Sequence, residues 1–423
     1  MKFADMDIAA LEQLRDKSQQ ALADYKATGM ALDMSRGKPC HDQLELSNDL
    51  HQALTDFKAS DGVDVRNYGV LLGIPEARQL FGDILGVPAA QVIIGGSSSL
   101  NLMYDMLSRA YIRGVEAGAT PWHKQEKIKF LCPSPGYDRH FAVSDSFGVE
   151  NIPVPMCADG PDMDIVEQMV NNDASIKGMW CVPMYSNPDG ITYSDDVVRR
   201  IAALKPAASD FRLFWDNAYC VHHLYEDDQD CLLNIYDECV KNGSEDMVYM
   251  FASTSKITMA SAGLAAVAMS PKNFEWIKQQ LSIQTIGYNR VNQLRHMRFL
   301  PDLNAVNALM MRHAQILRPK FEMVLNLLEK EIAPLEIASW HKPKGGYFIS
   351  FFAPEGTAKR IVALCKDAGV TMTGAGASYP YGNDPADSNI RIAPTFPSLD
   401  ELQKAMEVFC WAVKLAAAEQ KLS

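Results

Sequence analysis

Four groups of polar residues each follow a short apolar run, which is where ligands gather when such runs form a parallel sheet. The first group is Gly95-Gly96-Ser97-Ser98-Ser99, after QVII. Small residues let backbone N–H groups approach an anion, the N-terminus of a following helix favours negative charge, and three hydroxyls can donate to phosphate oxygens. A helix cap accounts for the same residues, because serine is common at that position.

The other three groups supply an amide, a carboxylate and an amine. Asn187 lies in the turn YSNPDG, Asp216 ends the run FRLFWD three residues before Tyr219, and Lys256 closes STSK after VYMFA. A carboxylate at the end of a buried strand is costly unless a cation or several donors pair with it. A lysine is usually solvated, but one that loses its water favours the neutral amine, which attacks aldehydes.

Apolar runs that could position these groups lie between about residues 90 and 270. They alternate with longer segments and read QVIIGG, KIKFLCPSP, IKGMWCVPM, FRLFWD, MVYMFAS and GLAAVAMS. Runs that are apolar throughout are typical of a mostly parallel sheet that helices bury on both faces. The sequence therefore predicts an α/β fold for this part of the chain.

The two ends of the chain predict a second unit. Apolar spacing indicates an amphipathic helix from Asp7 to about Lys26. Beyond about Leu300, a long helical stretch precedes the strand candidates GGYFISFF and NIRIAPT and a closing helix from Leu399. We predict a large α/β domain over residues 48–300 and a smaller α+β domain formed by residues 1–47 and 301–423.

Composition limits the classes of function. Lys and Arg number 40 against 52 Asp and Glu, and the net charge of −12 opposes binding to nucleic acid or to an anionic membrane surface. No apolar run reaches the roughly 20 residues of a membrane helix, and the start MKFADMDIAALEQLRDK lacks the basic and apolar pattern of a signal peptide. We expect a cytoplasmic protein. The nine cysteines include no CxxC pair, which favours reduced core residues and predicts no metal site.

Together the four groups resemble the fold-type I enzymes that use pyridoxal 5'-phosphate (PLP), specifically the class I aminotransferases. Asn187 precedes Asp216 by 29 residues, and Asp216 precedes Lys256 by 40, as in that family. The resemblance extends through SRGKP at residues 35–39, NYG at 67–69, KPKGGYF at 342–348 and NIRIAP at 389–394. SRGKP, CPSPGYDRHF and VNQLRH look closest to the type Ic aspartate aminotransferases.

The resemblance implies roles around the PLP ring, which the large domain would bind. Lys256 would form a Schiff base with PLP and later move the proton at the substrate's α-carbon. Asp216 would keep the pyridine nitrogen protonated, while Asn187 and Tyr219 would bind the phenolic oxygen. Tyr137, in CPSPGYDRHF, would stack on the ring, with plain core packing as the alternative.

The resemblance also implies a phosphate site and a homodimer. Tyr68 matches a tyrosine that reaches the phosphate from the neighbouring subunit. Many members of the family have an arginine eight residues after the lysine, but this chain has Leu264. Phosphate binding would then depend on hydroxyls and the helix dipole, or on an arginine elsewhere. The candidate hydroxyls belong to Ser97, Ser98, Ser99, Ser253 and Ser255.

Substrate binding would use a guanidinium group for each carboxylate. Arg391 matches the arginine that binds the α-carboxylate, and Gly37 and Asn187 match positions beside the substrate. A second carboxylate needs another cation, which the family often supplies from the partner subunit. We prefer Arg295, in VNQLRHMRF, and a surface salt bridge is its alternative role. The other candidates are Arg36, Arg139 and Arg290.

The resulting hypothesis is amino transfer from aspartate to 2-oxoglutarate by a ping-pong mechanism. A PLP-dependent lyase or decarboxylase stays open, because a fold does not fix a reaction. A ligand-sensing regulator with an aminotransferase-like domain is less favoured, since the first 40 residues are too few for a DNA-binding domain. A nicotinamide dehydrogenase rests only on TGAGAS at residues 373–378, which is not the GxGxxG that opens such a domain.

Overall fold

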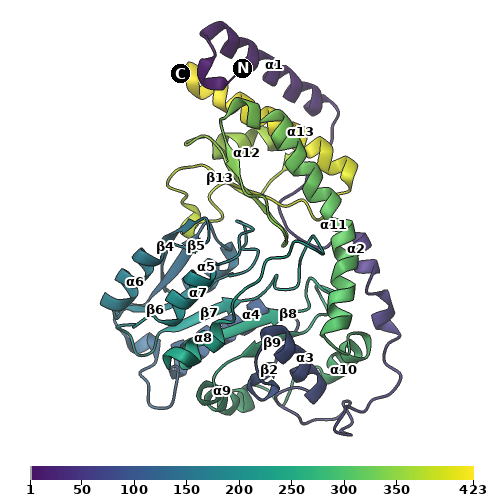
Figure 1. Ribbon diagram of the computed structural model, residues 1–423, viewed down its shortest axis with the longest axis vertical. Coiled ribbons are helices and arrows are strands. Elements are labelled where there is room, and N and C mark those ends of the chain that lie inside the picture. Colours follow the sequence, from purple (N-terminus) through teal and green to yellow (C-terminus); the bar gives the residue numbers. More distant parts are fainter. Residues whose placement is uncertain (1) are drawn as a thin grey trace.

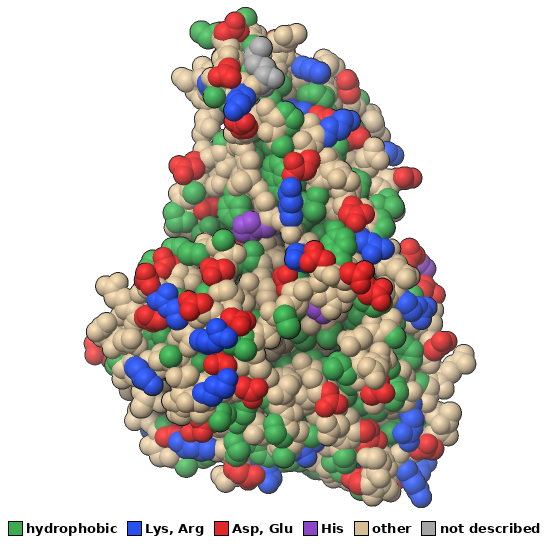
Figure 2. Space-filling model, viewed as in Figure 1, with side chains coloured by type: hydrophobic (Ala, Val, Ile, Leu, Met, Phe, Trp, Pro, Cys, Tyr) green, Lys and Arg blue, Asp and Glu red, His purple; other side chains and the backbone are tan. Residues whose placement is uncertain are grey.

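The computed structural model describes residues 2–423. Figure 1 shows an eight-stranded sheet with its helices in the lower half of the view and a smaller group of helices and strands above it, with the long helix α11 (Leu303–Glu331) running between them. Acidic and basic side chains are interspersed on the face shown in Figure 2, and neither sign gathers into a large patch. Within residues 2–423, no helix has both the length and the apolar character needed to cross a membrane.

The predicted α/β sheet is confirmed, and all six apolar runs form strands. Its order is β2-β9-β8-β7-β6-β3-β4-β5, and the ladder from β4 through β3, β6 and β7 to β8 is parallel. β9 is antiparallel to β8, because the 11 residues that join them form no crossover helix. The strands are β2 (Val92–Ile94), β3 (Lys129–Ser134), β4 (Glu150–Cys157), β5 (Gly160–Pro161), β6 (Ile176–Cys181), β7 (Arg212–Asp216), β8 (Val248–Ser253) and β9 (Ala265–Ala268).

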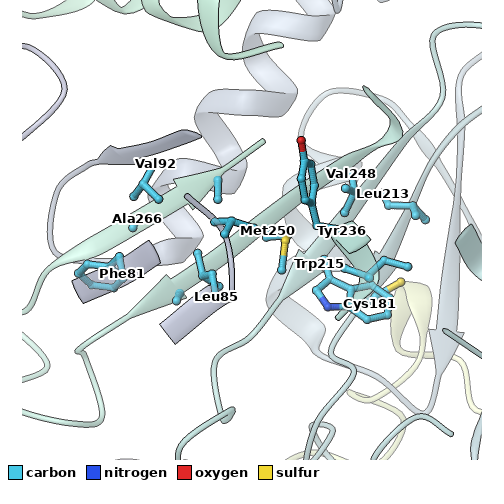
Figure 3. Packing of buried hydrophobic residues seen from close by; sticks show 14 of the residues in the cluster. Phe81, Leu85, Val92, Cys181, Leu213, Trp215, Tyr236, Val248, Met250 and Ala266 are labelled. Carbon is cyan, nitrogen blue, oxygen red and sulfur yellow. The ribbon is translucent and has the colours of Figure 1, made fainter. Parts of the chain in front are cut away.

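Helices bury both faces of this sheet. Leu213 and Trp215 of β7 face one core, shown in Figure 3, whereas Phe214 between them faces the other, as the two-residue period of a strand requires. The first core includes side chains of α3 (Pro75–Leu85), α6 (Met163–Asn172), α7 (Asp195–Ala202), α8 (Ile235–Asn242) and α10 (Arg290–Phe299). The second includes side chains of α4 (Ser99–Arg113), α5 (Asp138–Asp145) and α9 (Pro271–Gln284).

The smaller unit combines the two ends of the chain. β1 (Leu32–Asp33) pairs in parallel with β12 (Val370–Thr371), and α1 (Ile8–Ala27) packs along α13 (Leu399–Leu422), as Figure 1 shows. An antiparallel sheet contains β10 (Ser339–Trp340), β11 (Ile349–Phe352) and β13 (Asn389–Ile392), and the remaining α-helices are α2 (His41–Glu45) and α12 (Ala358–Asp367). The domain boundaries given above stay a prediction. Short 3-10 turns lie at Phe3–Asp5, Asn48–His51, Ala89–Gln91, Trp122–Lys124, Glu245–Met247, Ala333–Leu335 and Pro380–Gly382.

A buried carboxylate lies where the large sheet meets the small one. Asp189, in the turn after β6, is 1% exposed. Nδ1 of His341, which follows β10, donates a hydrogen bond to the backbone carbonyl of Asp189 at 3.0 Å. Burial raises the pKa of the Asp189 carboxyl to about 6, although His341 and Ser350 act in the opposite direction. The carboxyl of Asp189 therefore binds its proton more tightly in the folded protein than in the unfolded chain.

This preference predicts a pH-dependent effect of Asp189→Asn. The stability that the protonated carboxyl contributes is present below about pH 4 and is lost as the pH rises through about 6. A shift from 3.8 to about 6 corresponds to about 3 kcal/mol. Asp189→Asn should raise the free energy of unfolding at pH 8, with little effect at pH 4. Urea unfolding at the two pH values checks this, and an equal effect at both would contradict it.

Candidate active site

Predicted residues follow the carboxyl ends of β3, β6, β7 and β8, which run parallel and therefore end at one edge of the sheet. A cavity of about 340 Å³, here called the lysine cavity, lies at this edge. The small unit also lines this cavity, through residues that follow β1 and through Arg391 of β13. Among the lining residues are six predicted from the sequence: Gly37, Tyr137, Asn187, Tyr219, Lys256 and Arg391.

Lys256 lies among aromatic side chains three residues after β8 ends. Its Nζ is 4.7 Å from the ring centroid of Tyr219 and 5.8 Å from that of Tyr347. Both tyrosines are buried, and burial raises the pKa of each phenol above its ordinary value of 10. Burial likewise raises the pKa of Tyr137 to about 12. All three phenols therefore keep their protons at neutral pH.

Asp216 is the last residue of β7 and is 3% exposed. Its Oδ2 accepts a hydrogen bond from Nε2 of His140 on α5, at 3.2 Å. The His140 ring stacks on Trp180 of β6, with 4.6 Å between ring centroids. Oδ1 of Asp216 is buried and has no hydrogen-bond partner in residues 2–423. A carboxylate in this state favours a ligand that brings an N–H donor, above all a charged one.

Arg391, on β13, is 8% exposed. Its Nη1 donates to Oδ1 of Asp138 and to Oδ1 of Asn187, each at 3.1 Å. The guanidinium carbon lies 5.0 Å from the ring centroid of Phe348, and Nε is buried without a partner in the described residues. The guanidinium is thus held in place while it keeps donors for a carboxylate. The ring of Phe348 also explains Gly37, because a Cβ at position 37 would overlap it.

Two further arginines line the lysine cavity. Arg36 precedes Gly37, and Arg139 is the second residue of α5. Both are exposed, unlike Arg391. In residues 2–423 neither forms an ion pair with a carboxylate, whereas Arg391 pairs with Asp138. The cavity therefore has one fixed, buried guanidinium and two exposed ones.

The predicted phosphate residues lie at the start of α4 and the end of β8. Oγ of Ser255 donates to the carbonyl oxygen of Ser97 at 2.9 Å, which ties the loop of Lys256 to the glycine-serine loop. Ser98 is the N-cap of α4, but its side chain makes no capping hydrogen bond, so capping does not use this hydroxyl. A second cavity, of about 760 Å³, lies beside these loops. We call it the serine cavity, and its lining includes Gly96, Ser97, Gly263, Leu264, Asn292 and Arg295.

Tyr68 and Arg295 do not line the lysine cavity. Tyr68 is 83% exposed, and Arg295 lies in the serine cavity. Both predicted roles involve a neighbouring subunit, so both stay predictions. The glycine-rich TGAGAS segment forms a turn whose Gly374 lines the lysine cavity, and it opens no α-helix, so the structure gives no support to a dinucleotide site there.

His140 and Asp138 lie at the site although neither carried a prediction. Both occur in CPSPGYDRHF, beside Tyr137. A buried aspartate at a strand end requires a donor on a neighbouring element, and that signal could have pointed to His140. Asp138 gave no such signal, because its contact with Arg391 joins positions 253 residues apart.

Comparison with known proteins agrees with this geometry. A family model described as aspartate aminotransferase matches residues 6–423. The aspartate aminotransferase of Corynebacterium glutamicum is 45% identical over 422 residues, which are 99% of this chain and 97% of that protein. The crystal structure of an aspartate transaminase from C. glutamicum has a TM-score of 0.96 at 44% identity and is covered over 99% of both chains.

A more distant structure shows the same fold with a PLP derivative bound. The α-aminoadipate aminotransferase of Thermus thermophilus, in complex with N-(5'-phosphopyridoxyl)-L-leucine, has a TM-score of 0.74 at 17% identity over 95% of both chains. The family match favours a transaminase over the lyase, decarboxylase and regulator alternatives. The chain belongs to the aspartate aminotransferase family, whose members are fold-type I, PLP-dependent transaminases.

Proposed function

We propose that the chain binds PLP covalently through Lys256 and transfers an amino group from aspartate to 2-oxoglutarate by a ping-pong mechanism. The observation that carries this proposal is that three guanidinium groups, those of Arg36, Arg139 and Arg391, line one cavity with Lys256. A dicarboxylic amino acid brings two negative charges, and arginine is well suited to bidentate binding of carboxylates. The name of the C. glutamicum relative supports aspartate as the donor.

The residues around Lys256 fit the PLP ring. Asp216 has a buried oxygen, without a partner in residues 2–423, that can accept from a protonated ring nitrogen. Asn187 and Tyr219 offer donors for the phenolic oxygen, and Tyr137 offers an aromatic face. When bound, PLP supplies a ring that accepts the electrons released at the substrate's α-carbon. The α4 N-terminus fits the phosphate, together with the hydroxyls of Ser97, Ser98, Ser99, Ser253 and Ser255.

The chain's own residues then position groups and move protons. Nζ of Lys256 accepts the proton that leaves the substrate's α-carbon. Tyr219 keeps its own proton because burial raises the pKa of its phenol, so its hydroxyl remains a donor. The hydrogen bond from His140 fixes the orientation of the Asp216 carboxylate. His140 is therefore a positioning residue.

The two carboxylates of the substrate would meet different arginines. Arg391 is buried and fits the α-carboxylate, which would lie beside the backbone of Gly37. Arg36 and Arg139 are exposed and fit the second carboxylate at the solvent side of the cavity. The partner subunit's Arg295 is the alternative suggested by the sequence. 2-Oxoglutarate carries the same two charged ends and would bind these groups in the second half of the reaction.

A homodimer is part of the proposal. Tyr68, predicted to reach the partner's phosphate site, is 83% exposed. Gly69, which follows Tyr68, packs against Gly287. A Cβ added at Gly287 would lie 3.1 Å from the carbonyl oxygen of Gly69. Ile283 and Ile286, just before Gly287, are 81% and 61% exposed. Apolar side chains gathered on adjoining exposed segments are typical of a surface that another protein covers.

Lys256→Ala should abolish covalent PLP binding. The purified variant should lack the absorbance of a Lys–PLP Schiff base at about 360–430 nm and should lose at least a factor of about 10²–10⁴ in transamination rate. Borohydride treatment of the wild-type enzyme followed by peptide mapping should place the label on Lys256. Lys278→Ala, on α9, where the side chain is 44% exposed and pairs with Glu275, is the matched control. A label on another lysine would refute the assignment.

Arginine variants should separate the two carboxylate sites. Arg36→Gln or Arg139→Gln should lower kcat/KM for aspartate by about 10-fold or more, the range of one charge-assisted hydrogen bond, and leave alanine unaffected. Arg391→Gln should lower kcat/KM for both donors, because both carry an α-carboxylate. Arg113→Gln, on the exposed end of α4, is the control.

Initial rates with a panel of amino donors decide the wider proposal. Negligible activity of the wild-type enzyme with aspartate would sink it. If Arg36→Gln and Arg139→Gln both leave the ratio of aspartate to alanine activity unchanged, only the assignment of the second carboxylate to these two arginines is wrong.

A further inference from the structure

The position that carries a phosphate-binding arginine in many relatives cannot bind an anion in this chain. Leu264 is 2% exposed, and its side chain packs in the first of the two cores of the large sheet, the one that includes α3 and α10. Its backbone is also fixed, because its N–H donates to Oγ1 of Thr254 at 2.9 Å and its carbonyl accepts from the N–H of Thr254 at 2.8 Å. Any cation that binds the phosphate therefore comes from another position.

Arg295 lies beside the same loop. The amide of Asn292 donates to the carbonyl oxygens of Ala262 and Gly263, at 3.0 and 3.1 Å. Oδ1 of Asn292 in turn accepts from Nη2 of Arg295 at 2.6 Å. Asn292 thus connects Arg295 to the segment that runs from Lys256 to β9. Nε of Arg295 is buried and has no partner in residues 2–423, so a donor remains for a ligand.

The serine cavity, which Arg295 lines, has the character of an anion site. Gly95, Gly96 and Ser97 also line it, just before the N-terminus of the 15-residue helix α4. The first turn of α4 carries no acidic residue, and no Asp or Glu of the described chain lines the cavity. A Cβ at Gly96 would meet nothing within 4 Å, so the space in front of this loop is open. A guanidinium and a helix N-terminus on one cavity both favour a negatively charged ligand.

We infer that Arg295 binds the phosphate group of PLP from within its own subunit, in place of the arginine that is absent at position 264. This inference rests on the proposed PLP-dependent function. It gives Arg295 a different role from the second-carboxylate role predicted from the sequence. Ser255 connects the two halves of the site, since its hydroxyl bonds the backbone of Ser97 while its neighbour Lys256 lines the lysine cavity. The phosphate end and the reacting end of the cofactor are thereby served by adjoining loops.

Equilibrium binding of two ligands to the cofactor-free enzyme tests this inference. Pyridoxal lacks the phosphate group but shares the ring and the aldehyde of PLP. Arg295→Gln should weaken PLP binding by about 10- to 100-fold, the loss of one or two charge-assisted hydrogen bonds, and should change pyridoxal binding by less than about 2-fold. Arg298→Gln removes the same charge from the same helix, but Arg298 pairs with Asp56 at 3.2 Å and does not line the cavity. This control should bind both ligands as wild type does.

Each other outcome overturns a defined part of the account. If Arg295→Gln weakens the binding of PLP and of pyridoxal equally, Arg295 supports the structure of the site and does not bind the phosphate. If Arg295→Gln leaves the PLP affinity unchanged but reduces the preference for aspartate over alanine, Arg295 binds the substrate's second carboxylate and not the phosphate. Wild-type enzyme that fails to bind PLP would refute the proposed function itself. If Arg295→Gln does not fold, Arg295→Lys keeps the charge without the planar geometry, and a loss confined to PLP is again expected.

Discussion

The carboxylate of Asp216 sets the main electrostatic constraint on this structure. A buried negative charge is stable only when donors surround it, yet in residues 2–423 Asp216 has one partner, His140, and one oxygen with none. β7 holds this residue at the carboxyl end of the parallel sheet, and α5 brings His140 to it, stacked on Trp180. The protein thus maintains an acceptor whose natural complement is a ligand with a charged N–H. A protonated pyridine nitrogen has that chemistry.

The rest of the site depends on contacts between the two parts of the chain. Arg391 comes from the small antiparallel sheet, but its guanidinium is held by Asp138 and Asn187 of the large unit. Phe348 packs against both Arg391 and Gly37, so a larger residue at position 37 would have to displace the Phe348 ring. The lysine cavity is therefore formed by the junction of the two parts, and a movement between them would change its width. The site therefore requires Gly37 to pack correctly against Phe348, which lies more than 300 residues later in the chain.

The sequence predicted strand positions well, because runs buried on both faces are apolar throughout. It did not reveal that β9 runs antiparallel to β8, because the direction of a strand depends on the length and path of the segment that connects it to the strand before it. β4 was missed because Pro153 and Pro155 and its exposed residues interrupt the apolar pattern. Lys256, Asp216 and Asn187 could be predicted from order and spacing. Asp138 and the cavity of Arg295 could not, because each depends on how separate elements pack.

Thermal unfolding of Asp216→Asn, with and without PLP, tests the central claim most directly. If the buried carboxylate destabilises the cofactor-free fold and PLP supplies its missing donor, the cofactor-free variant should have a higher Tm than cofactor-free wild type. The rise in Tm on adding PLP should be smaller in the variant, because a bound ligand stabilises the fold in proportion to its affinity. A lower Tm without cofactor, together with the full PLP-induced rise, would contradict the account.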